Sequence, residues 1–271
     1  MAKLGVIGAA GRMGRQLLVA VSERDDVTLG AAVEAAGNAA VGTDASVLAY
    51  GVKPGVKVSD AVEAALQRVD VLVDFTIPEV SLHALENAVA AHTAMVIGTT
   101  GFTAKQRQQI SLAAEQIPVV FAPNFSVGVT LCVHLLEQAA RTLGNEYDIE
   151  VIEAHHRNKV DAPSGTALRM GEAVAKALGR NLADCAIYGR QGNTGIRTRD
   201  AIGFETVRAG DIIGDHTVLF AGTGERIEIT HKASDRMTFA RGAIRAAEWL
   251  SHQPAGLYDM SHVVGLHSGA E

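Results

Sequence analysis

The order of apolar runs and glycines at the start of the chain predicts a β-α-β unit. A short apolar strand over Leu4–Ile7 runs into a glycine-rich turn over residues 8–14, and an amphipathic helix follows to about Val21. A second strand, residues 28–33, ends at the acidic residue Glu34. Strand, glycine turn, helix, strand and acid in this order are typical of a dinucleotide-binding fold.

Apolar strands and helices continue to alternate as far as residue 143. The expected strands are 69–75, 94–97 and 118–121, and the expected helices are 61–67, 80–91, 104–116 and 129–143. Near-continuous apolar strands separated by helices predict a parallel sheet covered on both faces. Ligands bind at the carboxyl ends of the strands in such sheets, so the polar turns 74–76 and 98–102 are expected to border the ligand.

After Tyr147 the strands alternate polar and apolar residues. These strands are 147–152, 203–208, 216–220 and 225–231, and helices are expected over 166–178 and 240–250. Period-two alternation with glycine turns predicts a mostly antiparallel sheet with one exposed face.

The chain is therefore predicted to be α/β, with two domains. Residues 1–126 form an N-terminal Rossmann-like parallel sheet that binds the dinucleotide, and residues 127–235 form a C-terminal α+β domain for substrate binding and oligomerisation. The segment 236–271 is expected to pack back on the first domain.

Composition is that of a globular protein, with 48% hydrophobic and 20% charged residues among 271. The net charge of −6 argues against extended binding to nucleic acid or to a membrane surface. Cys132 and Cys185 lie far apart without CxxC spacing, which argues against a disulfide framework and a structural zinc site. No apolar run reaches membrane-spanning length. We expect a cytoplasmic protein without nucleic-acid or membrane partners.

The glycine turn is the first candidate binding site. Its spacing is GxxGxxG, whereas the usual fingerprint is GxGxxG, and a purely structural turn is the alternative. The glycines would let the backbone approach a pyrophosphate, Arg12 could reach the phosphates, and Glu34 would accept hydrogen bonds from a ribose diol. Glu34 would repel a 2′-phosphate, and residues 35–38 contain no Arg or Lys. NADH is therefore the expected cofactor, with NADPH possible.

The densest polar stretch is the second candidate site and has the sequence EAHHRNKVDAPSGTA over residues 153–167. We expect an irregular segment that ends in a helix capped by Ser164. The first N–H groups of that helix, on Gly165, Thr166 and Ala167, favour a bound anion. His155, His156 and Lys159 precede them closely. The interpretation is an anion site beside proton donors, and the alternative is a capped helix behind a surface loop.

Other functions are considered for the same residues. A serine hydrolase built on Ser164 with His155 or His156 lacks the G-x-S-x-G pattern, because position 162 is Ala. A metal site at the two histidines lacks a third ligand at metal spacing, so no metal is expected. A non-catalytic nicotinamide sensor would need only the dinucleotide fold. The arginine- and glycine-rich loop 188–199 is either a solvated, mobile loop or a lid or intersubunit arm over an acidic substrate.

The 153–167 stretch closely resembles the E-x-H-H-x-x-K-x-D-A-P-S-G-T-A signature of the 4-hydroxy-tetrahydrodipicolinate reductase family, also called dihydrodipicolinate reductases. The resemblance covers nearly the whole chain, including 8–14, 74–76, 98–101, 124–128 and 231–234. It implies hydride transfer from NAD(P)H to a cyclic imine dicarboxylate, which gives tetrahydrodipicolinate with loss of water in bacterial lysine and diaminopimelate synthesis. It also implies a homotetramer.

The resemblance further implies residue roles. His155 matches the family's proton donor/acceptor and Lys159 its proton donor, while His156, Gly165 and Thr166 match its substrate contacts. The implied cofactor contacts are Gly8, Ala9, Ala10, Gly11, Arg12, Met13, Glu34, Gly98, Thr99, Thr100, Ala122, Pro123, Asn124 and Phe125. Many members carry Arg where this chain has Ala35 and Ile77, and this departure agrees with NADH as the expected cofactor.

Overall fold

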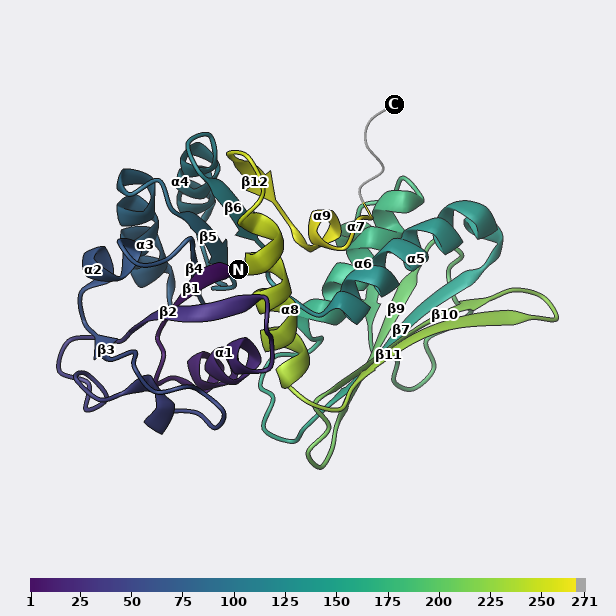
Figure 1. Ribbon diagram of the computed structural model, residues 1–271. Helices are drawn as coiled ribbons and strands as arrows, with labels where there is room; N and C mark the ends of the chain where they lie inside the picture. The colour runs from purple at the N-terminus through teal and green to yellow at the C-terminus, as the bar shows by residue number, and fades with distance from the viewer. Residues whose placement is uncertain (267–271) are drawn as a thin grey trace. The chain divides into compact units, whose positions relative to one another are not determined.

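The structure, a computed structural model, describes residues 1–266 and divides into two compact units (Figure 1). Unit 1 contains residues 1–127 together with residue 237 onward, and unit 2 contains residues 128–236. Residues 267–271, which end the segment predicted to pack on the first domain, lie outside the described residues.

Within the described residues, unit 1 is built on a seven-stranded parallel sheet in the order β12-β6-β5-β4-β1-β2-β3. The strands are β1 (Ala2–Ile7), β2 (Val27–Val33), β3 (Val58–Ser59), β4 (Val71–Asp74), β5 (Ala94–Ile97), β6 (Pro118–Phe121) and β12 (Gly256–Tyr258). The strand order reverses between β1 and β4, which is where sheets of this kind bind their ligands. The predicted Rossmann-like parallel sheet is confirmed.

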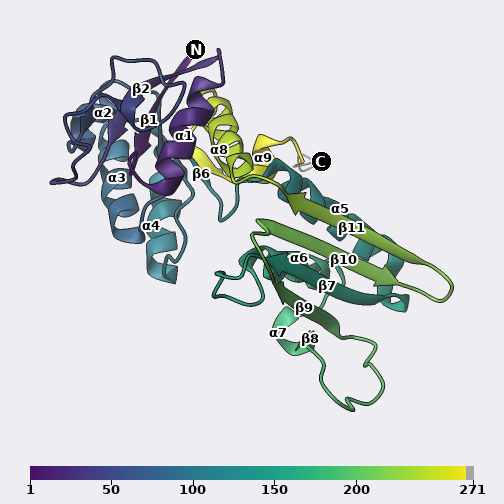
Figure 2. The ribbon, with the colours of Figure 1, turned by 90° about the horizontal axis from the view of Figure 1, so that it is seen from below.

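Helices cover both faces of this sheet. One face carries α1 (Arg12–Ser22), α8 (Met237–Leu250) and α9 (Met260–Val263), and the other carries α2 (Val62–Leu66), α3 (Pro78–Ala90) and α4 (Ala104–Ala114). Helix α8 packs beside α1, as both views show (Figures 1 and 2), and contacts strands β4 to β6. A short 3₁₀ helix, η1 (Ala45–Val47), lies between β2 and β3.

Local sequence accounts for several helix starts in unit 1. Pro78 occupies the first turn of α3, where its missing N–H costs no helix bond. Thr103 and Gln106 form a reciprocal capping box at the start of α4. No helix in the described part of the chain is long and apolar enough to cross a membrane.

Among the described residues, unit 2 contains a five-stranded sheet in the order β11-β10-β7-β9-β8. Its elements are α5 (Val127–Leu143), η2 (Gly144–Glu146), β7 (Asp148–His155), α6 (Gly165–Ala177), α7 (Leu182–Cys185), β8 (Ala186–Tyr188), β9 (Ile202–Arg208), β10 (Gly214–Ala221) and β11 (Arg226–Ala233). Helices α5 and α6 pack on one face of the sheet (Figure 1). The opposite face leaves Ile152 and Val207 exposed.

The prediction of a mostly antiparallel sheet was wrong in one half of the sheet. Strand β10 is antiparallel to β7 and β11, but β9 runs parallel to both β7 and β8. Helix α6 lies between β7 and β9 in the chain and returns it across one sheet face, as in other β-α-β crossovers. Alternation within a strand does not reveal this direction.

Candidate active site

The glycine turn at the end of β1 brings backbone close to backbone. Gly8 has a positive φ of 69°, and a Cβ placed on Gly14 would lie 2.0 Å from the Gly8 carbonyl oxygen. Only glycines tolerate this arrangement. Arg12 is exposed in the turn, and Met13 packs against the core of unit 1.

Glu34, at the end of β2, is tied to the same turn. Its carboxylate accepts a hydrogen bond from the Ala10 N–H at 2.9 Å and one from the Ala35 N–H at 3.0 Å. The Ala9 N–H donates to the Val33 carbonyl at 3.0 Å. The turn is therefore held to β2 by backbone amides, and the Ala10 N–H is already used by Glu34.

The turns after β4, β5 and β6 meet at the same edge of the sheet. The Phe75 ring lies over Gly98, where a Cβ would come within 2.1 Å of it, and packs against Phe125 at a centroid distance of 5.1 Å. Ala122 is buried and donates to Ile97, whereas Pro123 is exposed. The Asn124 side chain accepts a hydrogen bond from the Ser126 N–H at 2.8 Å.

A fully buried carboxylate links two of these turns. Asp74 accepts hydrogen bonds from the hydroxyls of Thr76 at 2.6 Å and Thr99 at 3.1 Å, and from Ser81. Burial raises the pKa of Asp74, and the hydroxyl hydrogen bonds oppose that rise. The Thr99 hydroxyl is bonded within this buried network, whereas Thr100 is exposed.

A cavity of about 410 Å³ opens over the carboxyl ends of β1 and β2. Its lining residues are Ile7, Gly8, Val33, Glu34, Ala35, Ala36, Asp60, Val62, Glu63, Thr76, Val80, His83 and Ala84. Three of them carry carboxylates, and no Lys or Arg is found among these residues. The close-packed glycines at the start of α1 and the acid at the end of β2 are features that suit a dinucleotide.

In unit 2, β7 runs on to His155, although an irregular segment was predicted from Glu153. The alternation of Ile149 and Val151 continues through Glu153 and His155, and all four side chains are buried. Two residues of the polar stretch are therefore fixed on a strand.

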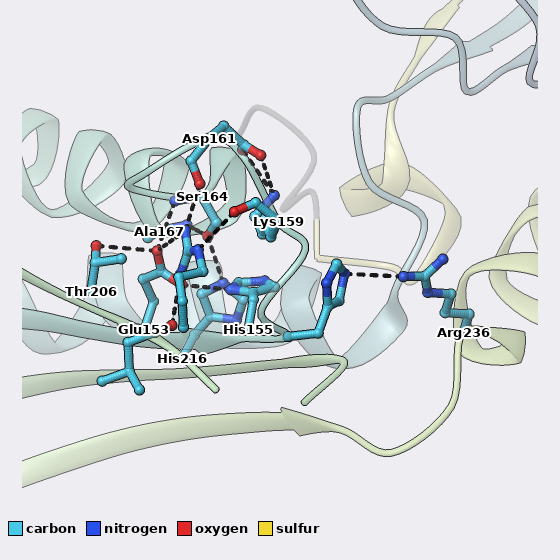
Figure 3. Close-up of polar contacts among 12 residues, drawn as sticks. Glu153, His155, Lys159, Asp161, Ser164, Ala167, Thr206, His216 and Arg236 are labelled. Carbon is cyan, nitrogen blue, oxygen red and sulfur yellow. Dashed lines mark hydrogen bonds and ion pairs between the residues drawn. The ribbon is translucent and has the colours of Figure 1, made fainter. Parts of the chain in front are cut away.

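The Glu153 carboxylate is 1% exposed. It accepts hydrogen bonds from both terminal guanidinium nitrogens of Arg208 at 2.9 Å, Thr206 Oγ1 at 3.2 Å, Ser164 N–H at 3.1 Å and His155 Nδ1 at 2.5 Å (Figure 3). Burial would raise the pKa of Glu153, but the bonds from Arg208 and His155 outweigh it and hold that pKa below its usual value.

Two histidines of the cluster are buried, and burial lowers the pKa of each. Burial lowers the pKa of His155, against the opposing effect of Glu153. Nδ1 of His155 lies 2.5 Å from the Glu153 carboxylate, which accepts hydrogen bonds and cannot donate them. His216 packs edge-on against His155 at 5.0 Å, and its Nε2 lies 2.8 Å from Ser164 Oγ. Burial lowers the pKa of His216 to about 4.

We expect His216 to make the protein less stable in mild acid. Its pKa falls from 6.5 when unfolded to about 4 when folded, so the unfolded chain binds the extra proton between these values. The contribution of neutral His216 to the free energy of unfolding is fully present above pH 6.5. It declines by about 3 kcal/mol as the pH falls to 4. Urea unfolding of wild type and His216→Gln from pH 8 to 4 measures this. An equal decline in both proteins would contradict the assignment.

Lys159 lies in the turn after β7. Its Nζ donates to both carboxylate oxygens of Asp161, at 2.7 and 2.8 Å. Arg208, besides binding Glu153, donates to the carbonyl oxygens of Lys159 at 3.3 Å and Asp161 at 2.5 Å. One guanidinium therefore holds both the carboxylate beside His155 and the turn that carries Lys159.

His156 has a different partner from His155. Its Nε2 lies 3.2 Å from a guanidinium nitrogen of Arg236.

Helix α6 begins at Gly165, and the predicted N-cap at Ser164 is confirmed by a 3.1 Å bond from the Ala167 N–H to its hydroxyl. The Ala167 N–H, which was expected to be free for an anion, is thus already used. At Gly165 a Cβ would meet no atom within 4 Å, so the space beside this helix start is open.

The structure also bears on the serine hydrolase, the metal site and the role of the loop 188–199. Ser164 is 2% exposed and its hydroxyl contacts His216, so it is no accessible nucleophile for His155 or His156. No group of three metal-ligating side chains occurs in the described residues. In the loop 188–199, Arg190 and Arg197 each bind Glu150 at 2.9 Å, so these two arginines are anchored to β7.

Arg208 and His216 are absent from the site residues that the sequence predicts. A signal exists for both, because each is a polar residue at a position that continues an apolar strand face. His216 shares the face of Val218 and Phe220, and Arg208 follows Phe204 with period two.

Comparisons with known proteins cover nearly the whole chain. A family profile described as "Dihydrodipicolinate reductase, N-terminus" matches residues 2–125, and "Dihydrodipicolinate reductase, C-terminus" matches residues 128–264. A 4-hydroxy-tetrahydrodipicolinate reductase from Pseudomonas fluorescens (strain SBW25) is 58% identical over 98% of this chain and 100% of that protein. One from Methylococcus capsulatus is 59% identical over 97% of this chain and 98% of that protein.

A solved structure is also similar. The dipicolinate-bound dihydrodipicolinate reductase from Paenisporosarcina sp. TG-14 superposes with a TM-score of 0.76 at 25% identity. The similarity covers 96% of this chain and 97% of that one.

Proposed function

The chain belongs to the dihydrodipicolinate reductase family, and from this membership we propose how its residues carry out the reaction. The protein is an NAD(P)-dependent oxidoreductase that reduces 4-hydroxy-tetrahydrodipicolinate to tetrahydrodipicolinate, in the route to diaminopimelate and lysine. The observation that carries this function is the complete polar stretch 153–167, folded with Glu153 bonded to both His155 and the start of α6.

The overall change adds a hydride and a proton to the ring and releases one water. The bound nicotinamide supplies the hydride. We assign proton transfer at the ring carbon to His155, whose bare Nε2 accepts a proton as the hydroxyl leaves and returns it after reduction. Lys159 donates a proton to the leaving hydroxyl and is reprotonated from solvent. Its positive charge also stabilises the negative charge that develops on the ring.

The substrate carboxylates are assigned to the start of α6 and to His156. Gly165 and Thr166 lie at the positive end of the helix dipole, which favours an anion. The open space beside Gly165 supports this placement. The related structure from Paenisporosarcina holds dipicolinate, a planar ring dicarboxylate similar in size to the proposed substrate.

We assign the dinucleotide to the turns of unit 1, over residues 8–13, Glu34, 98–100 and 122–125. NADH is preferred, because a 2′-phosphate near Glu34 would also meet the carboxylates of Asp60 and Glu63 in the same cavity. No lysine or arginine of the described lining offsets them.

The protein is proposed to be a homotetramer. The sheet face of unit 2 that the helices leave uncovered exposes Ile152 and Val207, and exposed apolar side chains of this kind suit contact with a second copy. Sedimentation velocity would measure the assembly. The alternative of a non-catalytic nicotinamide sensor has no support, because it leaves the buried Glu153–His155 pair without a use.

The test is an oxidation assay. The purified protein is mixed with NADH or NADPH and with the product of a dihydrodipicolinate synthase reaction supplied fresh. We expect oxidation of both cofactors, with a higher kcat/KM for NADH. The absence of oxidation with either cofactor would contradict the function, and a higher kcat/KM for NADPH would contradict only the cofactor assignment.

A further inference from the structure

The Glu153 side chain is the most heavily hydrogen-bonded carboxylate of the cluster around the proposed proton-transfer residue. It receives five hydrogen bonds while only 1% of the residue is exposed. Burying an unpaired carboxylate costs several kcal/mol of folding free energy. The number of donors around Glu153 therefore needs an explanation. Arg208 balances its charge, and His155 is the one donor with a second nitrogen left for chemistry.

We propose that Glu153, held by Arg208, is a positioning residue that keeps the His155 proton on Nδ1 and so leaves Nε2 bare as a proton acceptor. In a neutral imidazole one ring nitrogen carries the proton, and only the other can accept a hydrogen bond. The partner of one nitrogen therefore determines whether the other nitrogen is protonated. The carboxylate accepts and cannot donate, so it selects one tautomer. This inference rests on the proposed function of His155.

The other groups around the imidazole agree with this tautomer. His216 from β10 packs on His155 edge-on and is itself neutral, with its Nε2 used by Ser164. Burial lowers the pKa of His155, Glu153 raises it, and the positive charges of Lys159 and Arg208 lower it further. Across β10, His231 of β11 also acts electrostatically on His216. The positive groups disfavour a doubly protonated ring, so the site starts with an acceptor in His155 and a separate cation in Lys159.

A second Glu–Arg pair on the same strand separates positioning from simple ion pairing. Glu150 accepts two bonds from Arg190 and one from Arg197, each at 2.9 Å, and no histidine of the described residues is among its hydrogen-bond donors. Glu150→Gln therefore weakens an ion pair of β7 without changing the partner of His155.

The variant that tests the proposal is Glu153→Gln. The amide can accept from Arg208 through its oxygen, but its NH₂ group would donate to Nδ1 of His155 and move the proton to Nε2. We expect kcat for the cyclic imine to fall about 10–100-fold, with KM for NADH unchanged. The acid limb of the kcat/KM profile should move to lower pH, because the carboxylate that raises the pKa of His155 is gone.

The tautomer itself is measured by ¹⁵N NMR of the histidine side chains, with the His155 signals assigned by their absence in His155→Gln. Wild type should show protonated Nδ1 and bare Nε2, Glu153→Gln the reverse, and Glu150→Gln the wild-type state and acid limb. A wild type with its proton on Nε2 would overturn the proposal, even if Glu153→Gln fails to fold. So would a Glu153→Gln enzyme with wild-type kcat and acid limb.

The proposal and the proposed function fail in different ways. Wild type that does not oxidise NADH with the cyclic imine refutes the function, while the NMR result still decides the tautomer. Active wild type combined with an unchanged tautomer in Glu153→Gln refutes the positioning role alone.

Discussion

Lys159→Ala is expected to lower kcat for the cyclic imine by about 10²–10⁴-fold, the usual contribution of a positioned acid. The alanine removes both the proton donor and the positive charge that opposes the charge developing on the ring. KM for NADH should change less than about threefold, because Lys159 is not one of the residues proposed to bind the dinucleotide. Steady-state kinetics with varied NADH at saturating imine measure both effects.

Asp161→Asn is the matched control for this variant. Lys159→Ala also breaks the ion pair with Asp161, whose carboxylate binds Nζ at 2.7 and 2.8 Å. Asp161→Asn weakens the same pair but keeps the ammonium, so it should retain most of the wild-type kcat. Equal losses in the two variants would assign the effect to the ion pair. Normal turnover in both Lys159→Ala and His155→Ala would refute the catalytic assignment itself.

The parallel sheet of unit 1 could be predicted because its signals are local. Strands β5 and β6 coincide with the predicted 94–97 and 118–121, since strands buried on both faces are short, continuous apolar runs between helices. The cap at Ser164 could also be predicted, because a capping hydroxyl and the backbone N–H that donates to it lie three residues apart.

The inner part of the candidate site depends on partners distant in sequence. In the sequence Glu153 resembles a loop residue. In the structure its charge is balanced by Arg208, which lies 55 residues later in the chain and on the neighbouring strand β9. The same pairing keeps β7 regular through His155. The pattern of residues within one strand does not identify the strand that pairs with it. For the same reason the parallel direction of β9 was not predicted.

Charge in the loop 188–199 shows the same limit. Its arginines suggest either solvent or an acidic ligand, but Glu150 on β7 binds two of them. Gly203 on β9 makes room for that carboxylate, because a Cβ there would lie 1.7 Å from a Glu150 oxygen. The spacing of arginines and glycines carries no information about this partner.

Gly14→Ala is expected to damage the dinucleotide site through the backbone. A Cβ on Gly14 would lie 2.0 Å from the Gly8 carbonyl oxygen and 2.8 Å from the Ala9 Cα, and neither backbone atom can rotate away. Helix α1 must then move off the end of β1, although Leu17 and Leu18 of the same helix are fully packed in the core. We expect the free energy of unfolding to fall by about 3 kcal/mol, and the Kd for NADH to rise at least about tenfold.

Gly11→Ala gives the comparison, because its Cβ approaches the same Gly8 oxygen but stops at 3.1 Å. Gly11 has a φ of −68°, which alanine adopts without strain. The contact can relax by a small shift, so this variant should lose about 1 kcal/mol or less of stability, and its Kd for NADH should rise less than that of Gly14→Ala. Urea unfolding and fluorescence titration with NADH measure the two quantities. If both alanines had equal effects, the distance between α1 and the glycine turn would not be what positions the dinucleotide.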